Sequence, residues 1–168
     1  SLASFSAVEL GGFAIRAALD KAGITGDQVD YVFMGHVLQA GAGQITARQA
    51  AVNGGIPMGV PATTVNKVCL SGINAIYQAD RRIRAGDAQI VVAGGMESMT
   101  NAPHLLPGAR AGYRIGDGAI IDSMMYDGLY CAFDQVAMGE GTEKYAQAHG
   151  LEQLAAGVGE RHPAGGAG

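Results

Sequence analysis

The chain has 168 residues, of which 48% are hydrophobic and 15% are charged, whereas an average soluble domain is about 25% charged. The apolar content excludes a largely disordered chain, and the 27 glycines follow no three-residue period, which excludes collagen. The net charge of −4 argues against nucleic acid as the main partner, because phosphate binding requires a basic surface. So few charges among many small apolar residues indicate that further protein covers much of the surface.

The cysteines and the hydropathy pattern suggest a setting in the cell. Cys69 and Cys131 form neither a CxxC pair nor a disulfide framework, which favours a reduced, cytoplasmic location. No apolar run approaches the roughly 18 residues of a membrane helix, so we expect no membrane span. The first residues include neither Met nor a basic signal region, and we expect the chain to be the middle of a larger protein.

Alternating helix and strand patterns predict a layered α/β fold. The first predicted helix starts with a capping box formed by Ser6 and Glu9 and ends at Ala22, where Gly23 serves as the C′ residue. The next elements are a strand over 31–38, a helix over 45–52, a strand over 63–68 that leads directly into Cys69, a helix over 70–85 and a central strand over 89–93 that is apolar on both faces. The apolar stripe of the 70–85 helix consists of Leu70, Ile73, Ile76, Tyr77 and Ile83.

The second part of the chain is less regular. Periodicity fades over 96–137, which indicates a functional excursion or an assembly arm, and a helical pattern returns over 138–149. Five glycines fall in the last twelve residues. Three strands with open edges make a poor free-standing sheet, so we expect part of a domain.

The strongest chemical signal is the segment Val65 to Gly72. In this segment a strand delivers Cys69 to the first turn of a helix, where unpaired N–H groups and the helix dipole favour a thiolate. The chain has no Asp or Glu from Tyr31 to Ala79, which keeps negative charge away from this thiolate. A buried, inert cysteine remains the alternative on the spacing alone.

Several segments together resemble the thiolase family, most closely its acetyl-CoA acetyltransferases. The sequence over 65–72 reads Val-Asn-Lys-Val-Cys-Leu-Ser-Gly, which is similar to the family's nucleophile motif Val-Asn-x-Val-Cys-x-Ser-Gly. Other similar segments are 31–44, 47–51, the Gly-Gly-Met-Glu-Ser-Met run over 94–99, 127–129, and Met138-Gly139 followed by Glu143. The resemblance covers residues 2–151 and implies an incomplete N-terminal half over 1–103, without its first and last strands. It further implies part of the loop domain over 104–150.

The resemblance implies a two-step exchange between CoA thioesters. The Cys69 thiolate would attack an acyl-CoA carbonyl, and its backbone N–H would be an oxyanion donor. A second acetyl-CoA would then form acetoacetyl-CoA, and the reverse reaction would cleave it. Acyl-CoA and CoA are thus the expected partners, no metal or redox cofactor is implied, and the complete protein is expected to be a dimer or tetramer.

The chain also departs from the family pattern. The catalytic His and second Cys of thiolases lie in a C-terminal half that is absent, so we expect the isolated chain to lack the base and to be inactive. Met138 matches a family position beside the pantetheine arm, although Ala137 stands where many members have His. His162 lies in a His-Pro-x-Gly run of the atypical tail over 151–168, for which we favour an out-of-frame or spurious end over a working base.

Two other interpretations fit the same motifs. A ketoacyl-synthase-type condensing enzyme also places Cys at a helix start, and a truncated, non-catalytic product is compatible with the same motifs. Gly41 and Gly43 lack the third glycine and the acidic residue of a dinucleotide loop. The remaining candidates are given no catalytic role. Arg81, Arg82 and Arg84 are interpreted as cations at a helix end. The scattered histidines His36, His104 and His149 are interpreted as surface or interface residues, and Cys131 as a packed or interface thiol.

Overall fold

The computed structural model describes residues 2–151, and these divide after Gly128 into two compact units. The elements in chain order are α1 (Ala7–Ala22), η1 (Gly26–Gln28), β1 (Tyr31–Gly35), α2 (Thr46–Asn53), β2 (Ala62–Val65), α3 (Ser71–Arg84), β3 (Val91–Gly95), η2 (Met99–Asn101), β4 (His104–Leu105), β5 (Ile121–Asp122), η3 (Met124–Leu129) and α4 (Met138–Ala148). The domain division predicted at residue 104 stays a prediction.

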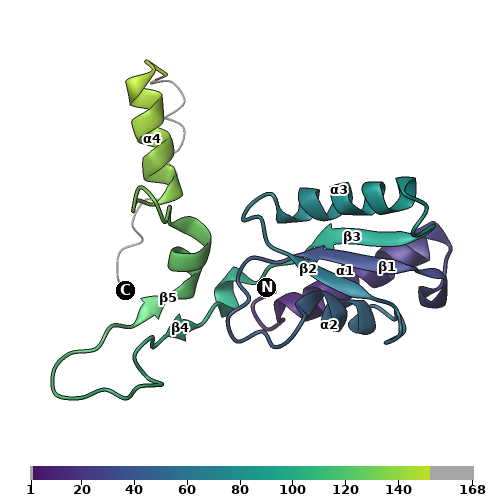
Figure 1. Ribbon diagram of the computed structural model, residues 1–168, viewed down its shortest axis with the longest axis horizontal. Coiled ribbons are helices and arrows are strands. Elements are labelled where there is room, and N and C mark those ends of the chain that lie inside the picture. The colour runs from purple at the N-terminus through teal and green to yellow at the C-terminus, as the bar shows by residue number, and fades with distance from the viewer. Residues whose placement is uncertain (1, 152–168) are drawn as a thin grey trace, which may run out of the picture. The chain divides into compact units, whose positions relative to one another are not determined.

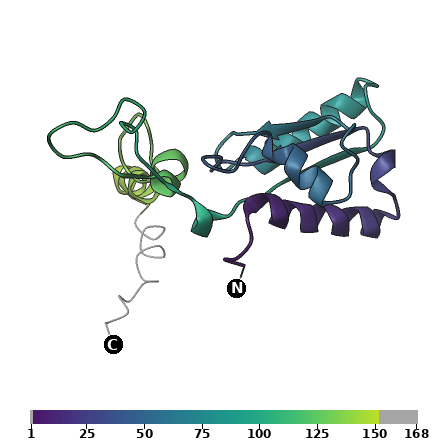
Figure 2. The same ribbon diagram turned by 90° about the horizontal axis from the view of Figure 1, so that it is seen from below.

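A parallel sheet with the strand order β2-β1-β3 forms the middle of the first unit. Phe33 in β1 is in register with Thr63 of β2 on one side and with Ala93 of β3 on the other. Helices α1 and α2 lie on one face of this sheet and α3 lies on the other (Figure 1). In Figure 2, which is seen from below, α1 runs along the face of the sheet. The predicted layered α/β fold is confirmed.

The side chains of β1 alternate between the two layers, as the period of two in a strand requires. Val32 and Met34 are buried among α1 and α2, together with Ile15 and Leu19. Phe33 points the other way and packs with Ala75 and Ala79 of α3. The two clusters therefore hold one helical layer each against the same strand.

Local signals placed the first helix correctly. The Ser6 hydroxyl accepts from the Glu9 N–H while the Glu9 carboxylate accepts from the Ser6 N–H, and Gly23 ends the helix in the left-handed conformation, with φ 68°. The capping box and the C′ glycine are thus confirmed. Both depend only on residues within a turn of each other.

Three predicted strand boundaries are wrong, and in two cases a distant carboxylate is the reason. Strand β1 ends at Gly35 because the N–H groups of the next turn bind Glu97 instead of a neighbouring strand. Strand β3 begins at Val91 because the N–H groups of residues 89 and 90 donate to the Asp30 carboxylate, which lowers the pKa of Asp30. Strand β2 ends at Val65, ahead of a loop that is described below.

The prediction of a central strand is wrong for β3. Strand β3 lies at one edge of the three-stranded sheet formed by the described residues, and its side chains are half-buried. The irregular segment contains short elements that periodicity could not show, namely β4 and β5, which pair antiparallel, and the single turn of η3.

Helix α3 turns its small residues, and not its apolar stripe, toward the sheet. Its buried residues are small, namely Ser71, Ala75 and Ala79. The large apolar side chains of the stripe are exposed: Leu70 51%, Ile73 67%, Ile76 57%, Tyr77 54% and Ile83 44%. A helix packs closest to a sheet through small residues, so the stripe faces outward here.

In the second unit, α4 follows a tight turn. Tyr130 and Ala137 form an antiparallel bridge across this turn, and the N–H of Cys131 donates to the Val136 carbonyl at 2.8 Å. The predicted helix over 138–149 is confirmed to within one residue. Within residues 2–151, no helix is long and apolar enough to cross a membrane.

Candidate active site

A groove of about 350 Å³ lies where β1, β2 and β3 end. Its lining includes Gly35 and Gly95, the last residues of β1 and β3, together with Cys69 and Glu97. The carboxyl ends of parallel strands are where α/β proteins place their ligands. Cys69 is an exposed free thiol, so the alternative of a buried, inert cysteine does not apply.

Cys69 lies in a loop that separates β2 from α3. The prediction placed it in the first turn of the helix, but Leu70 is the N-cap residue and Cys69 precedes it. The strand stops early because Asn66 Oδ1 accepts from the Val68 N–H at 3.0 Å, which turns the chain immediately after β2. The thiol still lies close to the positive end of α3.

The hydroxyl of Ser71 closes the same loop. Its Oγ accepts from the Lys67 N–H at 2.8 Å and donates to the Val68 carbonyl at 2.6 Å. The backbone N–H groups of Leu70 and Ser71 donate to the carbonyls of Lys67 and Val68. The N–H of Cys69 donates in none of these bonds, and it belongs to the residue whose thiol lines the groove.

Glycines let the start of α3 lie directly on the strand ends. A Cβ added to Gly35 would lie 2.6 Å from the Gly72 nitrogen, and one added to Gly95 would lie 3.4 Å from the Gly72 Cα. Real Cβ atoms do not approach backbone atoms as closely as the first of these distances. Gly35 is therefore required for the present position of the start of α3. The position of Cys69, which lies just before that start, depends on it as well.

Glu97 forms part of the groove wall and joins the ends of β1 and β3. Its carboxylate accepts from the N–H groups of Val37 at 2.9 Å and Leu38 at 3.1 Å, and its Oε1 lies 3.2 Å from His36 Nε2. Partial burial acts to raise the pKa of Glu97, but the bonds from His36, Val37 and Leu38 together outweigh it, so that the pKa is lowered. The sequence motif contained this residue, but its partners are about 60 residues away.

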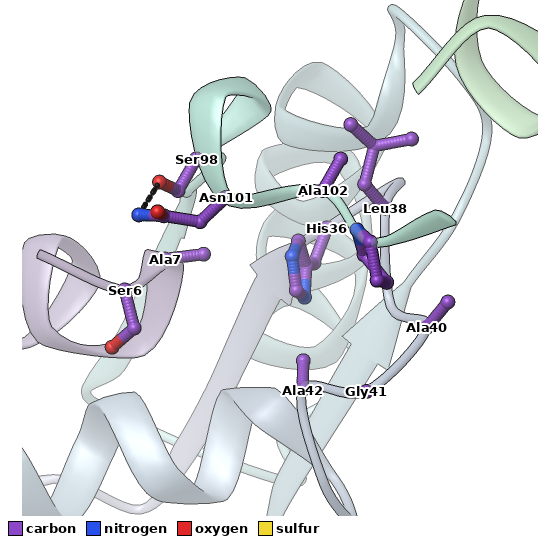
Figure 3. A pocket seen from close by; sticks show the side chains of 11 residues that line it. Ser6, Ala7, His36, Leu38, Ala40, Gly41, Ala42, Ser98, Asn101 and Ala102 are labelled. Atoms are coloured by element: carbon purple, nitrogen blue, oxygen red, sulfur yellow. Dashed lines mark hydrogen bonds between the residues drawn. The ribbon is translucent and has the colours of Figure 1, made fainter. Parts of the chain in front are cut away.

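His36 lies between the groove and a second pocket, of about 190 Å³, which Figure 3 shows. The alternation of β1 continues past its end, because Gly35 and Val37 line the groove while His36 and Leu38 line the second pocket. The ring of His36 is 2% exposed, and its Nδ1 lies 2.9 Å from the Thr46 hydroxyl. Both ring nitrogens thus have protein partners and the side chain is buried, so the prediction of a surface or interface histidine is wrong for His36.

The other predicted residues fall outside the groove. Met138 begins α4, is 44% exposed and lines a pocket of the second unit with Cys131, whose thiol lies 3.4 Å from the Asp134 carboxylate. The role predicted for Met138 beside pantetheine stays a prediction. His162 and the atypical tail, apart from Leu151, lie outside the described residues.

The helix-end cations and two further histidines have structural contacts or lie exposed. The guanidinium of Arg82 lies 4.1 Å from the centre of the Tyr31 ring, and Arg84 pairs with Asp80. His149 stacks on Tyr145, while His104 is exposed in β4. Within residues 2–151, no group of three His, Cys, Asp or Glu side chains is placed to hold a metal ion.

The fold and the groove define an α/β protein with an exposed cysteine between a parallel strand and a helix start. Comparison with known families is specific: the family profile described as "Thiolase, N-terminal domain" matches residues 1–156. The chain belongs to the thiolase family.

Three bacterial relatives give the match its detail. The chain is 56% identical over 144 residues to a probable acetyl-CoA acetyltransferase of Mycolicibacterium smegmatis, which covers 86% of the chain and 37% of the relative. It is 51% identical over 155 residues to an acetyl-CoA acetyltransferase of Cupriavidus necator, covering 92% and 39%. A third, from Pseudomonas aeruginosa, is 50% identical over 151 residues, covering 90% and 38%. The chain therefore spans less than two fifths of the length of these relatives.

Proposed function

We propose that this chain carries the nucleophile of a thiolase-type acyl transfer and that Cys69 is the residue that takes up the acyl group. The observation that carries the proposal is the exposed Cys69 thiol in a groove at the carboxyl ends of the parallel strands. The names of the relatives support acetyl-CoA as the acyl donor.

In the first step the Cys69 thiolate attacks the carbonyl carbon of an acyl-CoA. A tetrahedral intermediate forms, its oxyanion is stabilised by backbone N–H donors such as that of Cys69, and the bond to the CoA sulfur then breaks. CoA leaves and takes a proton, and Cys69 keeps the acyl group as a thioester. No metal or redox cofactor enters this exchange.

In the second step a second acetyl-CoA, deprotonated at its methyl group, attacks the carbonyl carbon of the Cys69 thioester and forms a carbon–carbon bond. The bond between the acyl carbon and the Cys69 sulfur breaks, so that acetoacetyl-CoA leaves and Cys69 is again a thiolate. Removing the methyl proton requires a base, and no histidine of the described residues lines the groove. We propose that the base belongs to parts of the family fold beyond residues 2–151, so the chain alone is expected to accept an acyl group without net turnover. Assembly into dimers or tetramers is proposed for the complete protein only.

The experiment is intact-protein mass spectrometry after exposure of the chain to acetyl-CoA. We expect an acetyl adduct in the wild type and in Cys131→Ser, which keeps the groove thiol, and none in Cys69→Ser. An adduct that persists in Cys69→Ser and disappears in Cys131→Ser would refute the assignment. Net formation of acetoacetyl-CoA by the chain alone would refute the proposal that the base lies outside residues 2–151.

A further inference from the structure

The backbone of Val68, directly before the nucleophile, has a conformation that its side chain disfavours. Its φ is 49°, in the left-handed region, where a β-branched residue is a steric outlier. The Val68 side chain is 42% exposed, so close packing does not hold it there. Such a conformation persists only where its surroundings enforce it.

Two polar side chains provide that enforcement. The Val68 N–H is bound by Asn66 Oδ1, and the Val68 carbonyl is bound by the hydroxyl of Ser71 at 2.6 Å. Ser71 is 4% exposed and also accepts from the Lys67 N–H at 2.8 Å. One hydroxyl thus holds the peptide groups on either side of the pair Lys67 and Val68, which precedes Cys69.

Ser71 does not act as a helix cap. Capping serines occupy the N-cap position and accept from N–H groups of the first helical turn, whereas Ser71 is the first residue of α3 and Leu70 is the N-cap. Its hydroxyl accepts from the preceding loop instead. The bonds of Ser71 therefore fix the Cys69 loop rather than the end of the helix.

We propose that Ser71 is a positioning residue for Cys69, an inference that rests on the proposed function. Its hydroxyl keeps Val68 in the left-handed conformation, and this conformation turns the Cys69 thiol into the groove. It also keeps the Cys69 N–H outside the loop's own hydrogen bonds, where the N–H can meet the oxyanion of an attacked thioester. Without the hydroxyl, Val68 leaves the left-handed conformation. The Cys69 thiol and the Cys69 N–H then no longer point at the carbonyl group of the same thioester.

The test is a double-mutant cycle with Ser71→Ala and Val68→Gly, made in the Cys131→Ser background so that Cys69 is the remaining cysteine. Glycine adopts a positive φ without the steric penalty, so Val68→Gly removes the strain that Ser71 has to hold. The readouts are the rate of Cys69 acetylation by acetyl-CoA and the rate of its alkylation by iodoacetamide. Alkylation needs only an accessible thiolate, whereas acetylation also needs the N–H in place.

We expect Ser71→Ala to lower the acetylation rate about tenfold, because small misplacements of reacting groups cost factors of ten to a hundred. Alkylation should change by less than about threefold, and in the Val68→Gly background Ser71→Ala should cost less than about threefold in acetylation. A serine with a purely structural role would lower both rates together, or cost the same in both backgrounds. Either result would overturn the proposal.

Ser123→Ala is the matched control. Ser123 is also buried, and its hydroxyl donates to the Pro103 carbonyl at the same distance of 2.6 Å, but it does not line the groove. Its removal should leave the ratio of the two rates unchanged.

Amide hydrogen exchange separates this proposal from the proposed function. If the wild-type chain takes no acetyl group, the proposed function fails. The positioning role is then decided by the Lys67 amide, which should exchange at least about tenfold faster in Ser71→Ala while amides of β1 keep their protection. Unchanged exchange at Lys67 would refute the positioning role by itself.

Discussion

Gly35 and Ser71 meet through their backbones: a Cβ on Gly35 would lie 2.6 Å from the carbonyl carbon of Ser71. This contact sets how closely α3 approaches the end of β1, and thereby where the Cys69 loop lies. We expect Gly35→Ala to destabilise the first unit by about 2 kcal/mol, the usual cost of forcing an extra carbon into a packed site. Acetylation of Cys69 should fall with it, and thermal unfolding together with the acetyl-adduct assay measures both effects.

Gly59→Ala is the control for this substitution, because nothing lies within 4 Å of a Cβ built at Gly59. It should change neither stability nor acetylation. Equal unfolding temperatures for Gly35→Ala and the wild type would contradict the close approach.

The Glu97 carboxylate makes the stability of the chain depend on pH. Because its pKa is lowered in the folded state, from an ordinary value near 4.5, the unfolded state binds the proton more readily. Its contribution is therefore complete above about pH 4.5 and is lost as the pH falls through the lowered pKa. We expect Glu97→Gln to cost about 2 kcal/mol at pH 7, the scale of hydrogen bonds to a charged acceptor, and progressively less below pH 4.5.

The measurement is the difference in unfolding free energy between wild type and variant as a function of pH. Using the difference removes the effect of Glu9 and Asp30, whose carboxyl pKa values are lowered as well. A Glu97→Gln difference that grows on acidification would contradict the sign of the argument.

The outward apolar face of α3 should dominate the solubility of the isolated chain. Leu70, Ile73 and Tyr77 share a hollow of about 410 Å³ on this face, and contiguous exposed apolar patches promote association. We expect Ile73→Glu to raise solubility and to reduce the fluorescence of a dye that binds apolar surface. Ile120 is equally exposed, at 67%, but does not line this hollow, so Ile120→Glu should have a clearly smaller effect. Equal effects of the two substitutions would refute a special role for the α3 face.

The sequence was informative where the cause of a structure lies within a few residues. The capping box, Gly23 and the nucleophile motif around Cys69 are local, and the helix and the loop position follow from them. Strand ends were misplaced because they are set by the carboxylates of Glu97 and Asp30 acting on residues about 60 positions away. No periodicity contains that information.

The same limit explains why the sequence did not show which face of α3 meets the sheet, and why it missed some residues of the site. An apolar stripe shows that a helix has two faces, but the small residues Ala75 and Ala79 decided which face meets the sheet. The pairing of His36 with Glu97 and the loop closure by Ser71 need tertiary register, so they were visible in the sequence only as unexplained polar residues near motif positions.

The capping box of α1 allows a prediction in which two bond lengths decide the order of effects. The Glu9 N–H lies 3.4 Å from Ser6 Oγ, which is long, while the Ser6 N–H lies 2.8 Å from the Glu9 carboxylate. Ser6→Ala should cost about 1 kcal/mol, as N-cap serines do. Glu9→Ala should lower the unfolding temperature at pH 7 at least as much, because it removes the shorter bond and the negative charge at the helix start.

The bonds from Ser6 lower the pKa of Glu9, so the effect of Glu9→Ala should fade below about pH 4.5 while that of Ser6→Ala persists in part. Ser4→Ala, at an exposed residue before the cap, is the neutral control. If Ser6→Ala lowered the stability more than Glu9→Ala did, and if that loss did not depend on pH, the longer hydrogen bond would be the one that stabilises the start of the helix.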